Sequence, residues 1–178
     1  DVFSELGVDR VRLTGGEPLL RREVVDVVER VAANPDVRDL SMTTNGVLLA
    51  KQAESLLSAG LDRVSVSLDT LRPERFKELT RRDRLPEVLE GIDAAVESGL
   101  KPLKINTVVM RGYNDDELTD MIDFARAKDA EIRFIEYMDV GGATQWSMDK
   151  VVSSREILSR LEGHFGSLEP VGDKGSAP

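Results

Sequence analysis

The sequence contains no cysteine and a single histidine, His164. Disulfide bonds are therefore excluded, as are zinc and iron–sulfur sites with cysteine ligands, and we expect no metal site in this chain. No apolar run approaches the roughly 20 residues that a membrane-spanning helix requires, and no signal-peptide pattern is present. The formal net charge of −9 disfavours nonspecific binding to nucleic acid or anionic membranes. We expect neither partner, and we expect a cytoplasmic location.

What the sequence does contain is typical of a folded, soluble domain. Apolar residues make up 40% of the chain and charged residues 32%, and 178 residues suffice for one domain with a sizeable core. The chain begins at Asp1 without methionine and ends in a flexible-looking, glycine-containing stretch over residues 172–178. We therefore expect it to be a segment of a longer protein.

Short apolar runs and helical patterns alternate along the chain. Strands are expected at residues 11–14, 40–44, 63–69, 101–110 and 131–138. Helices are expected at 24–31, 49–59, from Pro73, at 86–98, after Asn114, and from Ser153 or Ser154 to about Glu162. Asn114 and Glu117 have the spacing of a capping box, in which two side chains bond the first turn of a helix.

Glycine marks the joints of this repeat. Gly7, Gly60 and Gly99 are each followed by an apolar residue, the pattern of a helix that ends in a left-handed glycine before the next strand. A strand–helix repeat predicts a parallel sheet with right-handed crossovers. Five strands are fewer than a closed barrel contains. We predict an α/β fold, an incomplete βα barrel of the TIM type with parallel strands; a doubly wound sheet is the alternative.

Polar or small residues end all five expected strands. Because ligands of parallel βα folds bind at the carboxyl ends of the strands, these residues predict a polar cavity mouth. Alternate residues of a strand share a face, so one polar set should line the barrel interior. This set consists of Arg12, Thr14, Ser41, Thr43, Asn45, Ser65, Ser67, Asp69, Lys104 and Asn106.

Gly15 and Gly16 stand where the first strand passes into a helix. Two glycines allow the backbone to approach a ligand closely, and Glu17 can accept a hydrogen bond from an ammonium group. A tight strand–helix turn without a ligand is the alternative reading of the two glycines. The Lys-Ser/Thr pair of a phosphate-binding loop is missing.

Lys104 and Arg12 are cations expected on the inner wall. A lysine facing a cavity loses hydration unless it meets an anion, and the forked arginine donors suit phosphate or a purine edge. Together the two residues favour an anionic ligand. Inter-strand salt bridges to Glu136 or Asp69 are the alternative. A second function class, a Schiff-base lyase resembling an aldolase, would use Lys104 as nucleophile.

Five motifs occur in a characteristic order. They are Thr-Gly-Gly-Glu-Pro (14–18), Thr-Thr-Asn-Gly (43–46), Val-Ser-Leu-Asp (66–69), Lys-Ile-Asn-Thr-Val (104–108) and Glu-Tyr-Met-Asp-Val-Gly (136–141). The set resembles radical S-adenosylmethionine (SAM) enzymes, and among them the GTP 3′,8-cyclases of molybdenum cofactor biosynthesis. The resemblance covers nearly the whole chain. The lysine motif and the last motif are the ones that point to the cyclases.

The resemblance implies two ligands, SAM and GTP, on one rim. The positions matching SAM contacts are Gly16, Ser67 and Met138, and Gly15, Glu17 and Asn106 are expected beside them. Arg12, Thr43 and Lys104 match positions that contact GTP. The implied reaction cleaves SAM reductively to a 5′-deoxyadenosyl radical. That radical removes the ribose 3′-hydrogen of GTP, and C3′ then joins C8 of guanine.

The sequence departs from this family in one respect. The family holds two 4Fe–4S clusters with one cysteine motif near each end of the chain, and this chain has no cysteine to bind either. We therefore expect residues 1–165 to be the central part of the partial barrel, with about five of the six strands. Residues 166–178 would lead toward a missing cluster region.

This reading implies a homodimeric parent enzyme and an inactive fragment. A non-catalytic nucleotide-binding domain that has lost its clusters is a further alternative.

Overall fold

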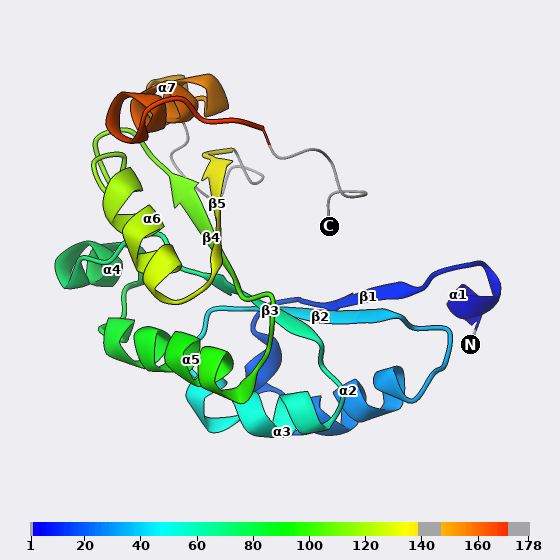
Figure 1. Ribbon diagram of the computed structural model, residues 1–178. Helices are drawn as coiled ribbons and strands as arrows, with labels where there is room; N and C mark the ends of the chain where they lie inside the picture. The colour runs from blue at the N-terminus through cyan, green and yellow to red at the C-terminus, as the bar shows by residue number, and fades with distance from the viewer. Residues whose placement is uncertain (1, 139–146, 171–178) are drawn as a thin grey trace.

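The computed structural model describes residues 2–138 and 147–170 (Figure 1). All five expected strands are present, all pairs are parallel, and the strands follow one another in the order β1-β2-β3-β4-β5. Their bounds are β1 Arg10–Leu13, β2 Asp39–Thr44, β3 Arg63–Ser67, β4 Lys104–Val109 and β5 Glu131–Glu136. A sheet whose strands lie in sequence order, each reached by a crossover, confirms the partial barrel rather than a doubly wound sheet.

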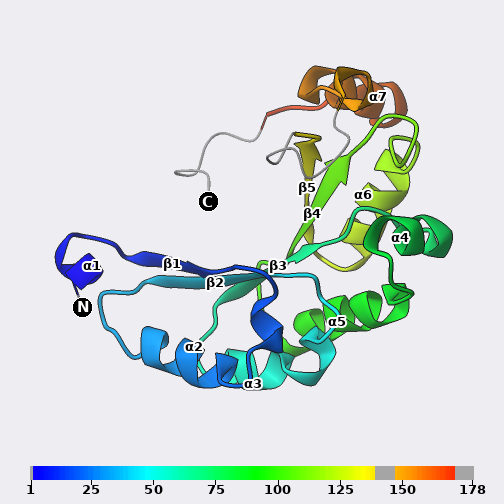
Figure 2. The same cartoon turned by 180° about the vertical axis from the view of Figure 1, so that it is seen from behind.

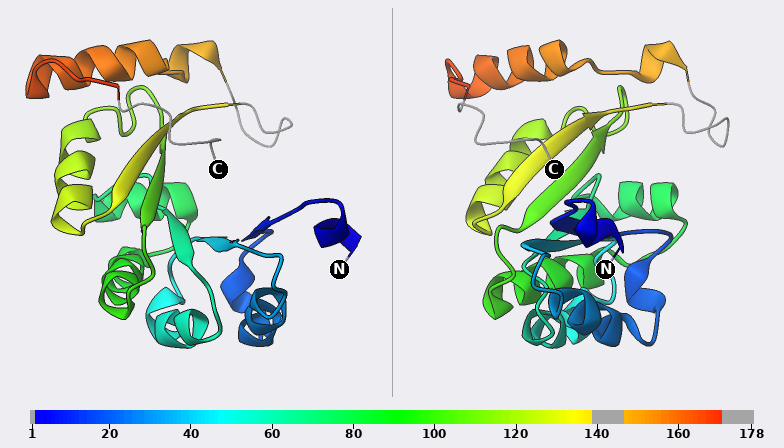
Figure 3. Two further views of the ribbon diagram at one scale, coloured as in Figure 1. Left: turned by 45° about the vertical axis from the view of Figure 1, so that its right-hand side comes forward. Right: turned by 90° about the vertical axis from the view of Figure 1, so that its right-hand side faces the viewer.

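The helices lie mainly on one side of this sheet. The α-helices are α1 Val2–Glu5, α2 Val24–Ala32, α3 Ala53–Ser58, α4 Pro73–Thr80, α5 Leu85–Ser98, α6 Leu118–Ala127 and α7 Ser154–Phe165. The described residues also form the short 3₁₀ helices η1 Pro18–Leu20, η2 Leu49–Lys51 and η3 Met148–Lys150. In Figures 1 and 2, α2, α3 and α5 cover the same face of β1–β3, and no described helix covers the opposite face. Figure 3 shows the strong twist between β1 and β5.

The core lies between the sheet and these helices. Met42, Val66 and Ile105 are fully buried on the helix-facing side of three neighbouring strands. They pack in one cluster with Val28 of α2 and Ile92 of α5. Each such side chain stabilises the fold by about 1.5–3 kcal/mol through removal of apolar surface from water. The alternation expected from strand parity is therefore present.

Left-handed glycines end helices as the sequence predicts. Gly60 has a φ of 98° and Gly99 a φ of 94°. The next residue in each case, Leu61 or Leu100, is buried and donates its backbone N–H back to the last turn of the helix. The glycine thus turns the chain, and the leucine fastens it to the core before the strand begins.

The expected helix over residues 49–59 is divided. Its first turn is η2, and α3 begins only at Ala53. Between them Gln52 leaves the helical region, with a φ of −127°, and its side chain donates to the carbonyl of Leu19 at 3.2 Å. This bond ties the break to η1, an interaction that local sequence cannot show.

The capping box expected at Asn114 is wrong. Helix α6 begins at Leu118, and the Asn114 side chain serves the preceding strands instead. Its oxygen accepts from the backbone of Met110 at 2.7 Å, and its amide donates to the carbonyls of Asp69 (2.6 Å) and Val108 (2.8 Å). Asn114 thereby joins the loop after β3 to the end of β4.

Glu117, the second residue of the expected capping box, is buried and does not serve as a capping side chain. Its side chain is 1% exposed and accepts from Thr70 Oγ1 at 2.7 Å, from the backbone of Leu71 at 2.9 Å and from Arg75 at 2.6 Å. These partners lie more than 40 residues away and use the acceptor atoms that a capping box would need. A buried carboxylate with several donors is the expected arrangement, because an unpaired one would be costly.

Helix α7 packs on a second, smaller cluster. Ile157 and Leu161 of this helix meet Val109 of β4 and Leu118 of α6. The helix begins as predicted, with Ser153 accepting from the backbone of Glu156 at 3.3 Å, and extends to Phe165. No helix among the described residues is long and apolar enough to cross a membrane.

Candidate ligand site at the carboxyl ends of the strands

The Gly-Gly turn lies at the carboxyl end of β1. Gly15 has a φ of 144°, and both Gly15 and Gly16 are exposed. A Cβ atom on either glycine would have no heavy atom within 4 Å. Space is therefore available beside the backbone, as a ligand that contacts main-chain groups requires.

Glu17 connects this turn to the end of β2. One carboxylate oxygen accepts from the backbone of Leu19 (3.1 Å) and from Thr44 Oγ1 (2.7 Å), and the other accepts from the backbone of Asn45 (2.7 Å). Thr44 Oγ1 in turn accepts from the backbone of Gly46 at 3.1 Å. Glu17 thus fixes the two loops relative to each other, in addition to carrying negative charge at the rim.

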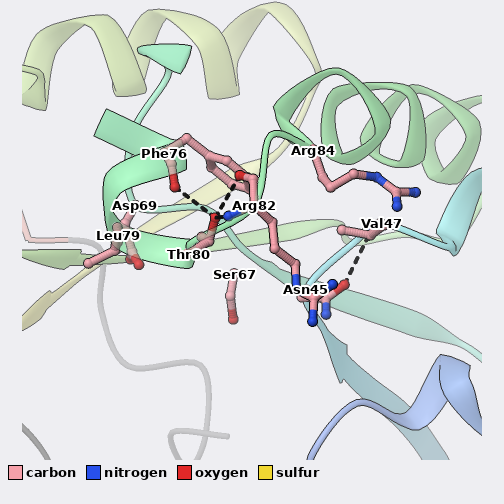
Figure 4. Close-up of a pocket in the computed structure, with 9 residues that line it drawn as sticks. All are labelled: Asn45, Val47, Ser67, Asp69, Phe76, Leu79, Thr80, Arg82 and Arg84. Carbon is pink, nitrogen blue, oxygen red and sulfur yellow. Dashed lines mark hydrogen bonds between the residues drawn. The ribbon is translucent and has the colours of Figure 1, made fainter. Parts of the chain in front are cut away.

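Two neighbouring cavities open beside these loops. The first, of about 270 Å³, is lined by Asn45, Ser67 and Asp69 together with residues of the α4–α5 loop (Figure 4). The second, of about 330 Å³, is lined by Glu17 and Leu20 and shares Asn45 with the first. Both lie at the carboxyl ends of the strands, where the sequence predicts the site.

Asp69 shapes the first cavity. Its carboxylate accepts from the backbone of Val108 at 2.8 Å, which ties the end of β3 to β4. Burial raises the pKa of Asp69, and the hydrogen bond from Val108 opposes that rise. The neighbouring Ser67 is exposed and lies opposite Asn106 in the parallel pairing of β3 with β4. Ser67 and Asn106, two of the predicted SAM contacts, are therefore adjacent.

The predicted GTP contacts lie deeper on the inner face. Thr43, Ser65 and Lys104 are consecutive partners across β2, β3 and β4. Arg12 lies opposite Ser41, and its Nε donates to Ser41 Oγ at 3.4 Å. The structure thus brings Arg12, Thr43 and Lys104 onto one wall.

Lys104 has a partner that sequence reasoning missed. Its side chain is 12% exposed, and its Nζ lies 3.3 Å from Glu131 Oε2, directly across the β4–β5 pairing. The alternative reading, an inter-strand salt bridge, therefore holds, but with a different carboxylate from Glu136 or Asp69. Glu136 accepts from the backbone N–H of Ser154 at 2.5 Å, and Asp69 accepts from that of Val108. Glu131 is 58% exposed, so the carboxylate side of this pair faces solvent while the lysine is largely covered.

Arg133 is a further inner-face cation that the sequence analysis did not single out. It lies opposite Asn106. Its pKa is lowered, first by burial and then by the nearby positive charges of Arg12 and Arg63, while Glu131 opposes this shift. The repulsion between positive charges held close together on a partly buried wall is reduced when an anion binds among them.

Arg63 itself is neutralised within the sheet. Its Nε and Nη2 donate to the two oxygens of Asp39 at 2.9 and 2.5 Å. The hydrogen bond from Arg63 lowers the pKa of Asp39. We therefore assign this pair to the structure of the sheet rather than to ligand binding.

Met138, predicted as a SAM contact, lies beyond β5 and is 62% exposed. It lines neither of the two cavities described above, and nor do Gly15 and Gly16. The last part of its motif, residues 139–141, falls outside the described residues.

An iron–sulfur cluster does not fit the residues of this chain. The sequence supplies no thiolate, and the described residues hold no group of three or more His, Cys, Asp or Glu side chains that could bind a metal.

A parallel, strand-ordered half-barrel with an open polar face and a Gly-Gly turn at its rim is a domain of the βα-barrel class. The model of the radical SAM superfamily matches residues 1–125, and the chain belongs to that superfamily.

Individual relatives are similar over the whole chain. It is 51% identical to GTP 3′,8-cyclase 3 of Mycobacterium bovis, covering 100% of this chain and 48% of the relative. It is 50% identical to GTP 3′,8-cyclase of Streptomyces coelicolor, covering 98% of this chain and 52% of the relative. The chain thus spans about half the length of the curated relatives it matches.

Solved structures with low sequence identity share the fold. A radical SAM methyltransferase from Sphaerobacter thermophilus matches with a TM-score of 0.67 at 18% identity, over 91% of this chain and 50% of that one. Coproporphyrinogen III oxidase from Escherichia coli matches with a TM-score of 0.65 at 13% identity, over 88% of this chain and 39% of that one.

Proposed function

We propose that this chain supplies SAM- and GTP-contacting parts of a GTP 3′,8-cyclase. That enzyme would convert GTP to (8S)-3′,8-cyclo-7,8-dihydroguanosine 5′-triphosphate, the first step of molybdopterin biosynthesis. The observation that carries the proposal is the identity of about half of all residues, over essentially the entire chain, with proteins named for this activity. The cationic inner wall agrees with a triphosphate substrate.

SAM would occupy the rim. The exposed backbone of Gly15 and Gly16 and the charge of Glu17 suit the ammonium group of its methionine end. Ser67 and Asn106, adjacent across β3 and β4, offer hydroxyl and amide groups to the remainder of the molecule. Met138 completes this proposed set of contacts.

GTP would occupy the inner wall below. Arg12, Thr43 and Lys104 are the proposed contacts, and Arg133 adds a further charge beside them. A phosphate approaching Lys104 would compete with Glu131 for the ammonium group. The pair therefore holds Lys104 in place before the substrate binds.

The residues of this chain would act by orientation. In the proposed reaction, C3′ of the ribose loses a hydrogen atom and then bonds to C8 of guanine. Holding SAM at the rim and GTP on the wall brings the two molecules together in a fixed orientation. The hard chemistry belongs to SAM and to an iron–sulfur cluster that this chain cannot ligate. We therefore propose that the chain alone is inactive and that the parent enzyme is a lyase.

The same proposal includes a homodimeric parent enzyme, a cytoplasmic location and the division of the chain at residue 165.

The test is anaerobic incubation of the longest encoded form of the protein with GTP, SAM and a reductant, followed by analysis of the nucleotide products. We expect the cyclised nucleotide from that form and none from this chain. A fully reconstituted long form that binds GTP but leaves it unchanged would overturn the proposal.

A further inference from the structure

The second rim cavity has walls of opposite charge. Glu17 lines one part of it, and Arg82 and Arg84 line another part. A zwitterion with an ammonium and a carboxylate at one end matches such a pair of walls, because each charge meets its opposite. Ser67 and Asn45 line the adjoining cavity, which Arg82 also enters.

Arg82 is the cation available for such a ligand. Within residues 2–138 and 147–170, no hydrogen bond or ion pair engages its guanidinium. Arg84, by contrast, is paired with Glu87 at 2.6 Å. Figure 4 shows the Arg82 side chain running from the α4–α5 loop toward Asn45.

The backbone of Arg82 is held in place although its side chain is not. Thr80 Oγ1 accepts from the Arg82 N–H at 3.2 Å and lies 3.0 Å from the Arg82 carbonyl. Arg81 takes a left-handed conformation, with a φ of 60°, which ends α4 and turns the chain toward the cavities. An arginine on a fixed backbone loses less freedom when it binds a carboxylate.

We propose that Arg82 binds the α-carboxylate of SAM, opposite the ammonium end near Glu17. The assignment rests on the proposed function, in which SAM occupies this rim. On this assignment, Arg82 is the residue through which the site distinguishes SAM from decarboxylated SAM.

The test compares binding of SAM and of decarboxylated SAM to the longest encoded form of the protein by anaerobic equilibrium dialysis. We expect Arg82→Gln to weaken SAM binding about tenfold and to leave binding of decarboxylated SAM unchanged. Arg82→Lys should recover part of the loss. Arg22→Gln is the matched control, because Arg22 is an exposed arginine on a neighbouring segment that lines neither cavity.

Three outcomes would count against the inference. If Arg82→Gln weakens both ligands equally, or neither, Arg82 does not bind the carboxylate while the SAM site itself stands. If the unaltered protein binds both ligands equally, no residue at the rim recognises the carboxylate. If the unaltered protein binds no SAM, the proposed SAM site falls, and this inference falls with it.

Discussion

A Cβ atom on Gly91 would overlap the carbonyl oxygen of Gly46. Gly46 has a φ of 80°, and a Cβ atom there would lie 2.9 Å from Val66 Cγ1. Helix α5 and the turn after β2 therefore approach each other so closely that their backbones are in contact at Gly91 and Gly46. That turn carries Asn45, whose backbone N–H donates to Glu17. The packing of α5 against the turn therefore sets the position of the rim.

Replacing Gly91 with alanine should therefore destabilise the fold. We expect Gly91→Ala to cost about 1–3 kcal/mol, because the added methyl group forces α5 and the turn apart. Gly163→Ala, the same change in α7 at a position with no heavy atom within 4 Å, should be neutral or stabilise by up to about 1 kcal/mol. Urea denaturation of both variants measures the difference. Equal stabilities would show that the contact between α5 and the turn is dispensable.

Glu17→Gln should loosen the rim. The amide keeps one acceptor oxygen where the carboxylate uses two, and its NH₂ group would face a donor, so we expect a loss of about 1–3 kcal/mol. The amides of Asn45 and Gly46 should exchange hydrogen faster than in the unaltered protein. Glu23→Gln, a change at an exposed residue with only a 3.8 Å ion pair, is the control. Unchanged exchange at Asn45 would contradict a clamping role for Glu17.

The strands and the two faces of the sheet could be predicted from sequence because both follow from short-range periodicity. Arg12, Thr43 and Lys104 share a wall for this reason alone. The partner of Lys104 could not be predicted, since it depends on the pairing of β4 with β5, which places Glu131 opposite. The sequence analysis did not single out Arg133 for the same reason, because its place opposite Asn106 also depends on this pairing.

The capping box predicted at Asn114 and Glu117 is wrong for a different reason. Their spacing satisfies a local rule, but donors and acceptors from the loop after β3 compete for the same atoms. A local motif is overridden when a buried partner distant in sequence requires its polar groups.

GTP affinity should respond in opposite directions to the two members of the inner-wall ion pair. Lys104→Gln should weaken GTP binding about tenfold or more, whereas Glu131→Gln should strengthen it slightly by removing a competitor for the lysine. Lys101→Gln, which removes an exposed lysine paired with Asp129 away from the wall, should have no effect. Calorimetric titration at low and high salt tests this. A gain in affinity from Lys104→Gln would exclude an anion at this wall.

Acid should weaken the attachment of α7. Two donors of Arg111 and one of Arg160 bond Glu156, and the Arg111 bond is the main cause that lowers its pKa from 4.5 to about 2. The stabilisation is therefore fully present above pH 4.5 and disappears as the pH falls toward 2.

The stability difference between the unaltered protein and Glu156→Gln should shrink over that interval. Glu162→Gln, on the same helix and without an ion pair among the described residues, should show no such trend. Thermal unfolding at a series of pH values provides the measurement. A difference that stays constant between pH 5 and pH 3 would contradict the role of the Glu156 carboxylate.

The alternation along β2, β3 and β4 has a consequence for how such a protein can change. Met42 and Ile105 hold the helices, while their immediate neighbours Thr43, Lys104 and Asn106 face the open side. Side chains on the open side of these strands can therefore be exchanged without disturbing the interior. A lineage can therefore acquire a new substrate one residue at a time on an unchanged scaffold, and laboratory evolution of this protein should randomise the open side and leave the other fixed.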